Sequence, residues 1–230
     1  MKANTPSLIL YFIASILSIV FTLAGPDSYL IYAKSLVVSS IFIYYLTTNN
    51  YKIDLIKGGI FLFSFIGDVF ILMDYEDSEI GVVLSFLIVY LLLIIHLIPS
   101  IKKIKLGTLD LISMISIIIV MVVLSITILS LPFEKMKTDF SLIIVYSIVL
   151  SIMICISVVK YISKSNFVFL NLLLMSLCFL LSDIFYVLNG FYLPLSAFSL
   201  IEISTQVFSY FFMVNYFIAN DRSLRKLNDN

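Results

Sequence analysis

Five ionisable residues lie inside long apolar stretches of this sequence: Lys34, Asp68, His96, Asp183 and Glu202. A charge in the hydrocarbon of a bilayer is costly unless it is paired or faces water, so such residues are functional candidates. Two carboxyl groups that share a low-dielectric pocket do not readily ionise together, and one can act as a general acid while the other is an ionised base. This pairing suits acid-initiated cleavage of an ether-type bond, and it suits proton-coupled transport equally well.

Because the sequence contains a single histidine, it argues against two other kinds of catalytic site. A Ser-His-Asp triad needs its histidine within hydrogen-bond reach of the nucleophile, and a zinc site built from several histidines needs more than one. His96 falls near the far end of its apolar stretch, where we expect it to snorkel to the membrane interface. Cys155 and Cys178 have no metal-binding or redox spacing, and we expect them to be small packing residues.

The composition places the whole chain in a membrane. Of its 230 residues, 62% are hydrophobic and only 12% are charged, and the mean hydropathy is +1.16. A soluble domain cannot cover its surface with so few charges, and the zero net charge indicates no basic surface for nucleic acid. The five Pro and seven Gly residues leave no room for a flexible linker. We therefore predict an all-α polytopic bundle that forms one transmembrane domain over residues 1–230.

A membrane-spanning helix needs about 20 largely apolar residues, and the sequence contains eight such stretches with polar or Gly- and Pro-containing breaks between them. The predicted transmembrane helices cover residues 8–24, 29–47, 57–73, 80–98, 109–131, 140–159, 167–187 and 199–219. The first stretch could instead be a signal peptide, with Lys2 as its charged start. The even number of spans and the short break before the second span favour a helix of the bundle.

The Lys and Arg residues set the expected orientation of the bundle, because these residues are enriched in cytoplasmic loops. One side of the membrane would carry only Lys135 and Lys137. The other side would carry Lys2, Lys52, Lys57, Lys102, Lys103, Lys105, Lys160, Lys164, Arg222, Arg225 and Lys226. Both termini are therefore predicted to be cytoplasmic, and the acidic loop 73–79 is predicted to face outward. The Ile-, Lys- and Asn-rich composition without Trp favours a bacterial cytoplasmic membrane.

Four of the five ionisable residues are expected at one depth. Lys34, Asp68, Asp183 and Glu202 each lie a few residues from the predicted outer end of their helices, which corresponds to roughly 5–8 Å along a helix axis. Four charges from four helices at one level suggest a shared, hydrated pocket. Ser64 lies one turn before Asp68 on the same face, where it would hydrogen-bond this acid.

Other polar residues near the four charges could complete this pocket. In the eighth span, Thr205, Gln206 and Ser209 follow Glu202 at i+3, i+4 and i+7, which gives a polar stripe that must face the bundle interior. In the third span, Gly67 allows another helix to approach closely. The candidate substrate-binding residues are Lys34, Ser64, Ser182, Tyr186, Asn189, Glu202, Thr205 and Gln206.

Structural roles are open for some of these residues. Lys34 could form an ion pair with Asp68 or Asp183 that only fixes helix packing. Glu202 could lie at the interface near the start of its helix, where the helix macrodipole favours an acid. The Asn-Gly pair at 189–190 is also an ordinary C-cap and turn signal.

Three motifs carry a resemblance to a known family: AKSL at 33–36, FSFIGD at 63–68 and LLSDIFYVLNGF at 180–191. In this order, and over nearly the whole chain, they are similar to the YhhN-like family of integral membrane proteins, which includes the lysoplasmalogenases. The resemblance implies that Asp68 and Asp183 are a catalytic pair. It also implies that Lys34 is the membrane lysine of the family.

The same resemblance implies a reaction, the hydrolysis of the vinyl ether bond of a lysoplasmalogen. This lysophospholipid would come from the bilayer, and the products would be a fatty aldehyde and a glycerophospho-alcohol, with no metal or cofactor required. One aspartate would protonate the vinyl carbon, and the other would stabilise the resulting cation and activate a water. Asp183 is favoured as the acid, since Lys34 would hold Asp68 ionised.

The sequence departs from the family in two places, and both bear on the identity of the substrate. Tyr90 stands where the family often has a histidine, and STQVFSY at 204–210 stands where the family has an aromatic and glutamine element. Two further classes of protein would use the same residues. One is a proton-coupled transporter of a lipid or small solute, and the other is a structural or signalling membrane protein that contains an ion pair.

Overall fold

The computed structural model describes residues 4–24, 27–73, 78–101, 107–131 and 139–228. The helices in these ranges are α1 (Thr5–Ala24), α2 (Asp27–Thr48), α3 (Leu55–Leu72), α4 (Ser78–Ile101), α5 (Thr108–Leu129), α6 (Phe140–Ser163), α7 (Phe167–Val187), a π-helical turn η1 (Leu188–Tyr192) and α8 (Ser196–Asn228). Within the described ranges there is no strand, and eight helices are long and apolar enough to cross a membrane. The predicted all-α bundle and its eight spans are confirmed.

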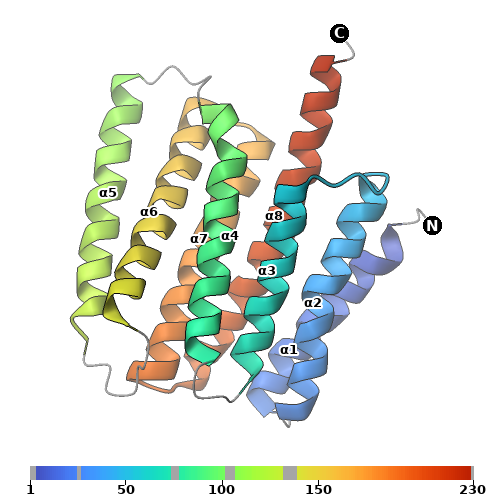
Figure 1. The fold of residues 1–230 in the computed structure, drawn as a ribbon, viewed down its shortest axis with the longest axis vertical. Coiled ribbons are helices and arrows are strands. Elements are labelled where there is room, and N and C mark those ends of the chain that lie inside the picture. The colour runs from blue at the N-terminus through green and yellow to red at the C-terminus, as the bar shows by residue number, and fades with distance from the viewer. Residues whose placement is uncertain (1–3, 25–26, 74–77, 102–106, 132–138, 229–230) are drawn as a thin grey trace.

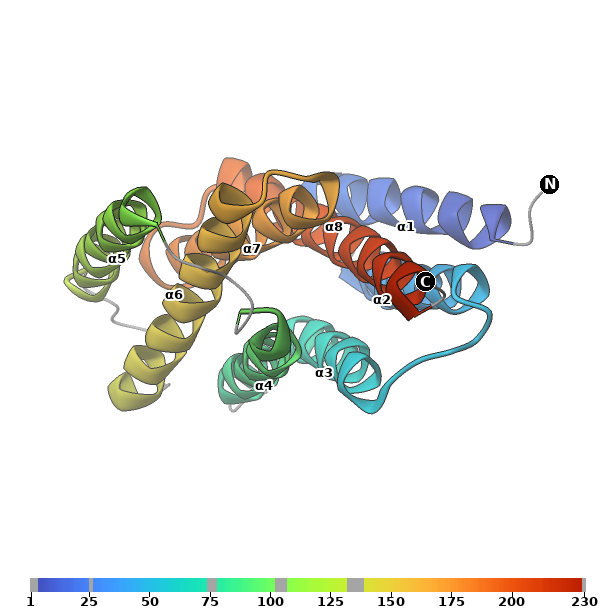
Figure 2. The ribbon, with the colours of Figure 1, turned by 90° about the horizontal axis from the view of Figure 1, so that it is seen from above.

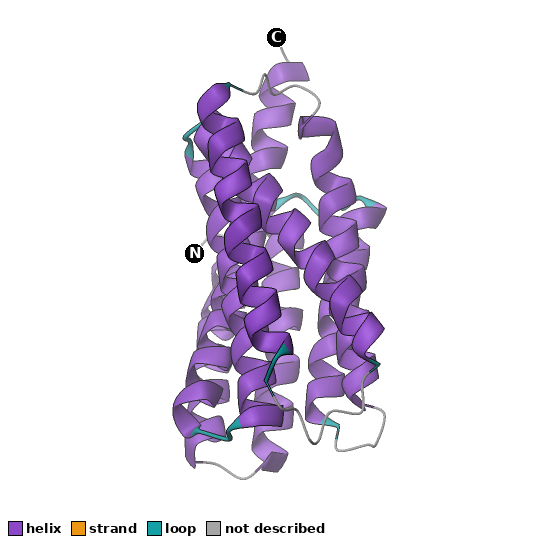
Figure 3. Cartoon of the chain, turned by 90° about the vertical axis from the view of Figure 1, so that its left-hand side faces the viewer, coloured by secondary structure: helices purple, strands orange, loops and turns teal. Residues whose placement is uncertain are grey.

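The helices run side by side along one axis (Figures 1 and 3). The most closely packed pairs are α7 with α8, α3 with α4 and α1 with α2. In the end-on view of Figure 2, α7 and α8 lie in the middle, the other two pairs lie beside them, and α5 is at the edge of the bundle beyond α6. This arrangement brings α4, α6, α7 and α8 together around the candidate site.

The first helix is an integral part of the bundle. Tyr11 and Ala14 are buried, and the Tyr11 hydroxyl donates to the backbone carbonyl of Val207 in α8. Ser15 and Ser18 are also buried and donate to carbonyls of their own helix. These contacts favour a structural helix over a signal peptide for this segment.

Reciprocal contacts between glycine and phenylalanine join α3 to α4. A Cβ added to Gly67 would lie 2.8 Å from the ring of Phe86, and a Cβ added to Gly81 would lie 2.6 Å from the ring of Phe70. Each ring therefore occupies the space that a side chain would need on the facing helix. This close approach, expected for Gly67 from the sequence, fixes the position of the neighbouring Asp68.

A buried polar cluster joins α2, α3 and α8. The Lys57 ammonium donates to Asp221 Oδ1 at 2.6 Å and lies 3.1 Å from Asp54 Oδ2. The Tyr45 hydroxyl and the Asn49 amide donate to Asp221 Oδ2 at 3.0 and 3.1 Å. Burial raises the pKa of Asp54, but the hydrogen bond from the Lys57 backbone N–H and the Lys57 charge together hold the pKa below its ordinary value. Lys57 was expected to mark a cytoplasmic loop, whereas its side chain is buried and joins α3 to α8.

Lys160 also differs from the expectation. The predicted sixth span ends at residue 159, whereas α6 continues to Ser163 and includes this lysine. Its side chain is 1% exposed, and its ammonium donates to the Leu97 carbonyl of α4 at 3.3 Å and lies 5.6 Å from the centre of the Phe169 ring.

Residues 74–77 of the predicted acidic loop lie outside the described residues. The side of the membrane on which this loop lies stays a prediction.

Candidate functional site

Asp183 of α7 lies where α4, α6 and α7 meet. Its Oδ2 atom accepts hydrogen bonds from the Tyr90 hydroxyl of α4 at 2.6 Å and from the Tyr146 hydroxyl of α6 at 2.7 Å. The two hydroxyl oxygens are 3.4 Å apart. Both donors use one carboxyl oxygen, and within the described residues no hydrogen bond to Oδ1 is present. Asp183 therefore has one oxygen that two hydroxyls fix in place and one without a hydrogen-bond partner among the described residues.

Asp68 of α3 accepts hydrogen bonds in a similar way, here from two residues of α8. Its Oδ1 atom accepts from the Gln206 amide at 2.6 Å and from the Tyr210 hydroxyl at 2.9 Å. Asp68 is 2% exposed. Ser64 is fully buried beside it, but its hydroxyl has no hydrogen-bond partner among the described residues. The expected hydrogen bond from Ser64 to the acid is therefore wrong, because Gln206 and Tyr210 occupy that role.

Glu202 and Lys34 complete the group of charges. Glu202 is 7% exposed and lies beyond the first turn of α8, so its position does not fit the alternative of an interfacial acid at the helix start. Lys34 is 4% exposed and acts electrostatically on both Asp68 and Glu202. Within the described residues Lys34 forms no direct ion pair, because the salt bridges found there involve Lys57. A structural ion pair of Lys34 with an aspartate is therefore not present.

A small cavity brings several predicted residues together, and half of the residues that line it are apolar. Its volume is about 60 Å³, and its lining includes Ser182, Asp183, Tyr186, Glu202 and Gln206. This volume can hold a few water molecules. Asp68 and Lys34 do not line the cavity. Gln206 connects the cavity to Asp68, since its side chain borders the cavity and also donates a hydrogen bond to Asp68.

A second cavity reaches Asp183 from the other side. Its volume is about 80 Å³, and apart from Asp183 and Tyr146 its lining is mainly apolar, with Met121, Leu150 and Ile184 among the residues. Asp183 and Tyr146 border both cavities. The tyrosine-bonded acid therefore lies where a cavity with several polar groups meets a mainly apolar cavity.

The remaining predicted residues have structural contacts. Ser182 donates to the Glu202 carbonyl at 3.2 Å and so joins α7 to α8. Thr205 donates to the carbonyls of Ile201 and Glu202 in its own helix. The Asn189 amide oxygen accepts from the Leu195 backbone N–H at 3.1 Å, which stabilises the turn between α7 and α8. Binding of substrate by these residues stays a prediction.

His96 does not snorkel to the interface as expected. Its ring packs edge-on against Tyr216 and Phe217 of α8, with centroid distances of 6.1 and 5.5 Å. Its Nε2 atom is buried and has no hydrogen-bond partner among the described residues. The ring lies inside the bundle because it packs against aromatic residues of α8. The spacing of residues in the sequence does not predict this contact.

Three tyrosines around the acids were missed as site residues. Tyr210 follows Gln206 at i+4 and so continues the polar stripe of α8, a signal that the sequence does contain. Tyr90 was noted only as a departure from the family pattern, and nothing in the sequence near Tyr146 points to Asp183. A buried tyrosine hydroxyl usually finds a partner, but only the packing of α4 and α6 against α7 shows which partner it is.

These features define a class of protein, a polytopic helical membrane protein with buried or partly buried carboxyl groups, two of which accept hydrogen bonds from tyrosine or glutamine side chains. Within the described residues no group of three or more His, Cys, Asp or Glu is arranged to hold a metal ion. Residues 29–220 match the YhhN family, and the chain belongs to that family. No curated protein and no solved structure gives a significant match.

Proposed function

We propose that this YhhN-family protein is a membrane-embedded hydrolase that cleaves the vinyl ether bond of a lysoplasmalogen. The observation that carries the proposal is the position of Asp183, a tyrosine-bonded carboxyl that borders both a cavity with several polar groups and a mainly apolar cavity. A lipid that is cleaved between its chain and its head group must place an apolar part and a polar part on either side of the reacting acid. Family membership supports the same reaction.

In the proposed reaction, Asp183 donates a proton to the vinyl carbon that is not bonded to the ether oxygen. The positive charge is then shared between the other vinyl carbon and the oxygen, as in an oxocarbenium ion. A water molecule adds to that carbon and gives up a proton to a second carboxylate. The bond between carbon and ether oxygen in the resulting hemiacetal then breaks, and the hydroxyl proton of the hemiacetal passes to the leaving oxygen. The second carboxylate returns its proton to Asp183, so that one water is consumed and a fatty aldehyde and a glycerophospho-alcohol are released.

Two glutamates, Glu79 and Glu202, border the same cavity as Asp183. We assign the second carboxylate to Glu202, because it is the buried one of the two. Asp68 does not border this cavity, but it accepts a hydrogen bond from Gln206, which does. Asp68 is therefore a positioning residue, and its charge, balanced by Lys34, contributes to the field at the site. This assignment replaces the pair of two aspartates that the family resemblance implied.

The departure from the family at Tyr90 is compatible with this reaction. The Tyr90 hydroxyl donates to Asp183, so it can hold the carboxyl in place and return a proton during turnover. We infer that tyrosine takes the part in this chain that a histidine takes in many relatives.

The test is an aldehyde-release assay with purified protein in detergent, where no pH gradient exists. Wild-type protein should release aldehyde from a lysoplasmalogen, and Asp183→Asn, which keeps the shape of the side chain, should lower turnover by about 10²–10⁴-fold. An unchanged unfolding temperature for this variant would show that the loss is chemical. Absence of aldehyde from lysoplasmalogens and related enol ethers would remove the proposal. Lipid movement in sealed vesicles that is driven by a pH gradient, without product, would instead support a proton-coupled transporter.

A further inference from the structure

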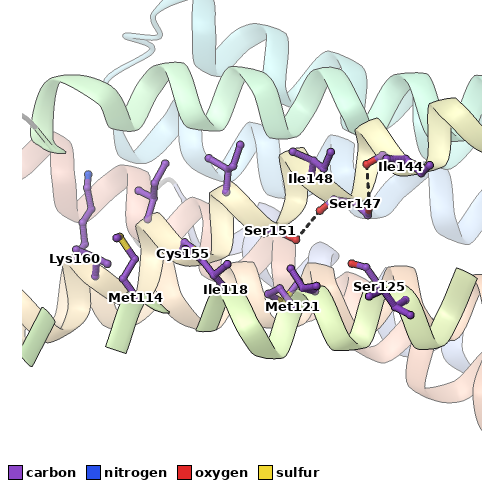
Figure 4. A pocket seen from close by; sticks show the side chains of 15 residues that line it. Met114, Ile118, Met121, Ser125, Ile144, Ser147, Ile148, Ser151, Cys155 and Lys160 are labelled. Atoms are coloured by element: carbon purple, nitrogen blue, oxygen red, sulfur yellow. Dashed lines mark hydrogen bonds between the residues drawn. The ribbon is translucent and has the colours of Figure 1, made fainter. Parts of the chain in front are cut away.

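A groove between α5 and α6 has a volume of about 730 Å³, which is within the usual size of a small-molecule site. Figure 4 shows side chains of both helices turned toward this space, among them Met121 of α5 and Ser151 and Cys155 of α6. Ser147 and Ser151 donate to the Ile144 and Ser147 carbonyls of their own helix, so their hydroxyl protons are already used. An apolar occupant suits this lining.

The groove is continuous with the candidate site. Met121, Ser125 and Ser147 line both the groove and the apolar cavity that reaches Asp183. An occupant of the groove can therefore extend to the tyrosine-bonded carboxyl without leaving the apolar space.

The length and surroundings of the groove indicate what occupies it. Its lining on α6 extends from Ile144 to Lys160, which is about 24 Å at the rise of an α-helix. One leaflet of the hydrocarbon core is about 15 Å thick, so the groove can hold a full lipid chain. At the far end, the Lys160 ammonium is bonded to Leu97 of α4 and lies over Phe169. The methylene stem of Lys160 therefore lines the end of the groove.

We propose that this α5/α6 groove binds the single hydrocarbon chain of a lysolipid, with the bond at its polar end beside Asp183 and its methyl end near Lys160. The inference rests on the proposed function, because it names where the chain of that substrate lies. The least buried of the eight spanning helices is α5, and the groove that it borders is a direct route from the bilayer to the acid.

Photo-crosslinking tests the position of the chain without any turnover. The probes are ether-linked lysophospholipids, which carry no cleavable vinyl ether, with a diazirine either near the head group or at the chain end. In vesicles, the first probe should label the region of Tyr146, and the second should label α6 near Val159. An excess of unlabelled lysolipid should suppress both signals. Labelling that does not depend on the diazirine position, or that lysolipid does not reduce, would overturn the inference.

A groove-filling substitution tests the same point by activity. Cys155→Phe should lower turnover of long-chain substrates by about tenfold or more, while short-chain substrates that end before Cys155 are cleaved as before. The matched control is Val145→Phe on the same helix, since Val145 is 47% exposed and lines none of these cavities. Unchanged chain-length preference in Cys155→Phe would overturn the groove but leave the hydrolase intact. Position-dependent crosslinking in a protein that releases no aldehyde would overturn the hydrolase but leave the groove intact.

Discussion

At the scale of residues, the candidate site contains two acids that accept hydrogen bonds in a similar manner but differ in what they face. Asp68 is buried, and Asp183 is partly buried. Asp183 accepts from two tyrosines and borders two cavities. Asp68 accepts from Gln206 and Tyr210 and borders neither cavity. A carboxyl that is fixed through one oxygen is pre-organised for proton transfer, because little reorganisation is needed when charge develops. The difference in access assigns different roles to the two acids.

The hydroxyls of Tyr90 and Tyr146 can be removed one at a time. Tyr90→Phe and Tyr146→Phe keep the ring and delete one hydrogen bond to Asp183, a loss of about 1.5–3 kcal/mol for a bond to a charged group. Each variant should therefore lose about 10- to 100-fold in aldehyde release. Tyr51→Phe is the control, because this tyrosine is exposed. Equal activities of all three variants would contradict a role for the pair.

The assignment of Glu202 and Asp68 predicts unequal effects of neutral substitutions. Glu202→Gln removes the base that borders the cavity and should lower turnover about as much as Asp183→Asn, by about 10²–10⁴-fold. Asp68→Asn keeps an oxygen that can accept from Gln206, so it should retain more activity than Asp68→Ala. Rates of aldehyde release by folded, detergent-purified variants provide the comparison. An Asp68→Asn protein as inactive as Asp183→Asn would show that Asp68 takes part in the chemistry directly.

At the scale of elements, close helix packing holds the acids in place. The α3–α4 contact depends on Gly67 and Gly81, each of which faces a phenylalanine ring. The α7–α8 contact includes the bond from Ser182 to the Glu202 carbonyl. Helices in a bilayer gain little from burying apolar surface, and small residues that permit close approach are the common solution.

Gly67→Ala tests the α3–α4 contact. The added methyl group would lie 2.8 Å from Phe86, so the helices must separate or the ring must move, at a cost of about 1–3 kcal/mol. The unfolding temperature in detergent should fall, and Phe86→Leu should restore part of it. Gly58→Ala is the matched control on the same helix, because its nearest neighbour is at an ordinary 3.8 Å. If both variants unfold at the same temperature, the contact does not limit packing.

At the scale of the whole molecule, two groups of charged residues are separate from each other in the part of the chain that the structure describes. One is the candidate site with Lys34, Asp68, Asp183 and Glu202, and the other is the cluster of Lys57 with Asp54 and Asp221. The second group joins α2, α3 and α8. It can hold these helices in register while α5, at the edge of the bundle, leaves the groove beside α6 open to lipid.

The predicted orientation can be measured by labelling with a membrane-impermeant maleimide. In a background with Cys155→Ser and Cys178→Ser, Ser78→Cys should be labelled in intact cells, because the start of α4 is predicted to lie outside. Ser223→Cys, near the C-terminal end of α8, should be labelled only after permeabilisation. The opposite pattern would reverse the orientation and place the candidate site near the cytoplasmic face.

The sequence by itself determined the class of the protein, its spanning helices and its buried charges. Runs of about 20 apolar residues can only satisfy their backbone as helices in a bilayer, and an acid such as Asp68 or Asp183 within such a run stands out by its cost. The polar stripe of α8 was predictable for the same reason, since Glu202 and Gln206 repeat with the period of a helix.

Only the tertiary structure decided which groups meet. Tyr90 and Tyr146 are 56 residues apart in the sequence, and both donate to Asp183. Nothing in the spacing of either tyrosine encodes this, because side-chain partners across helices depend on how the helices rotate and cross. Lys57 and Lys160 show the same limit, since lysines near span ends resemble loop residues in sequence, and only packing places them in the interior. The different roles that we propose for Asp68 and Glu202 likewise rest on the cavity, which exists only once the helices have packed.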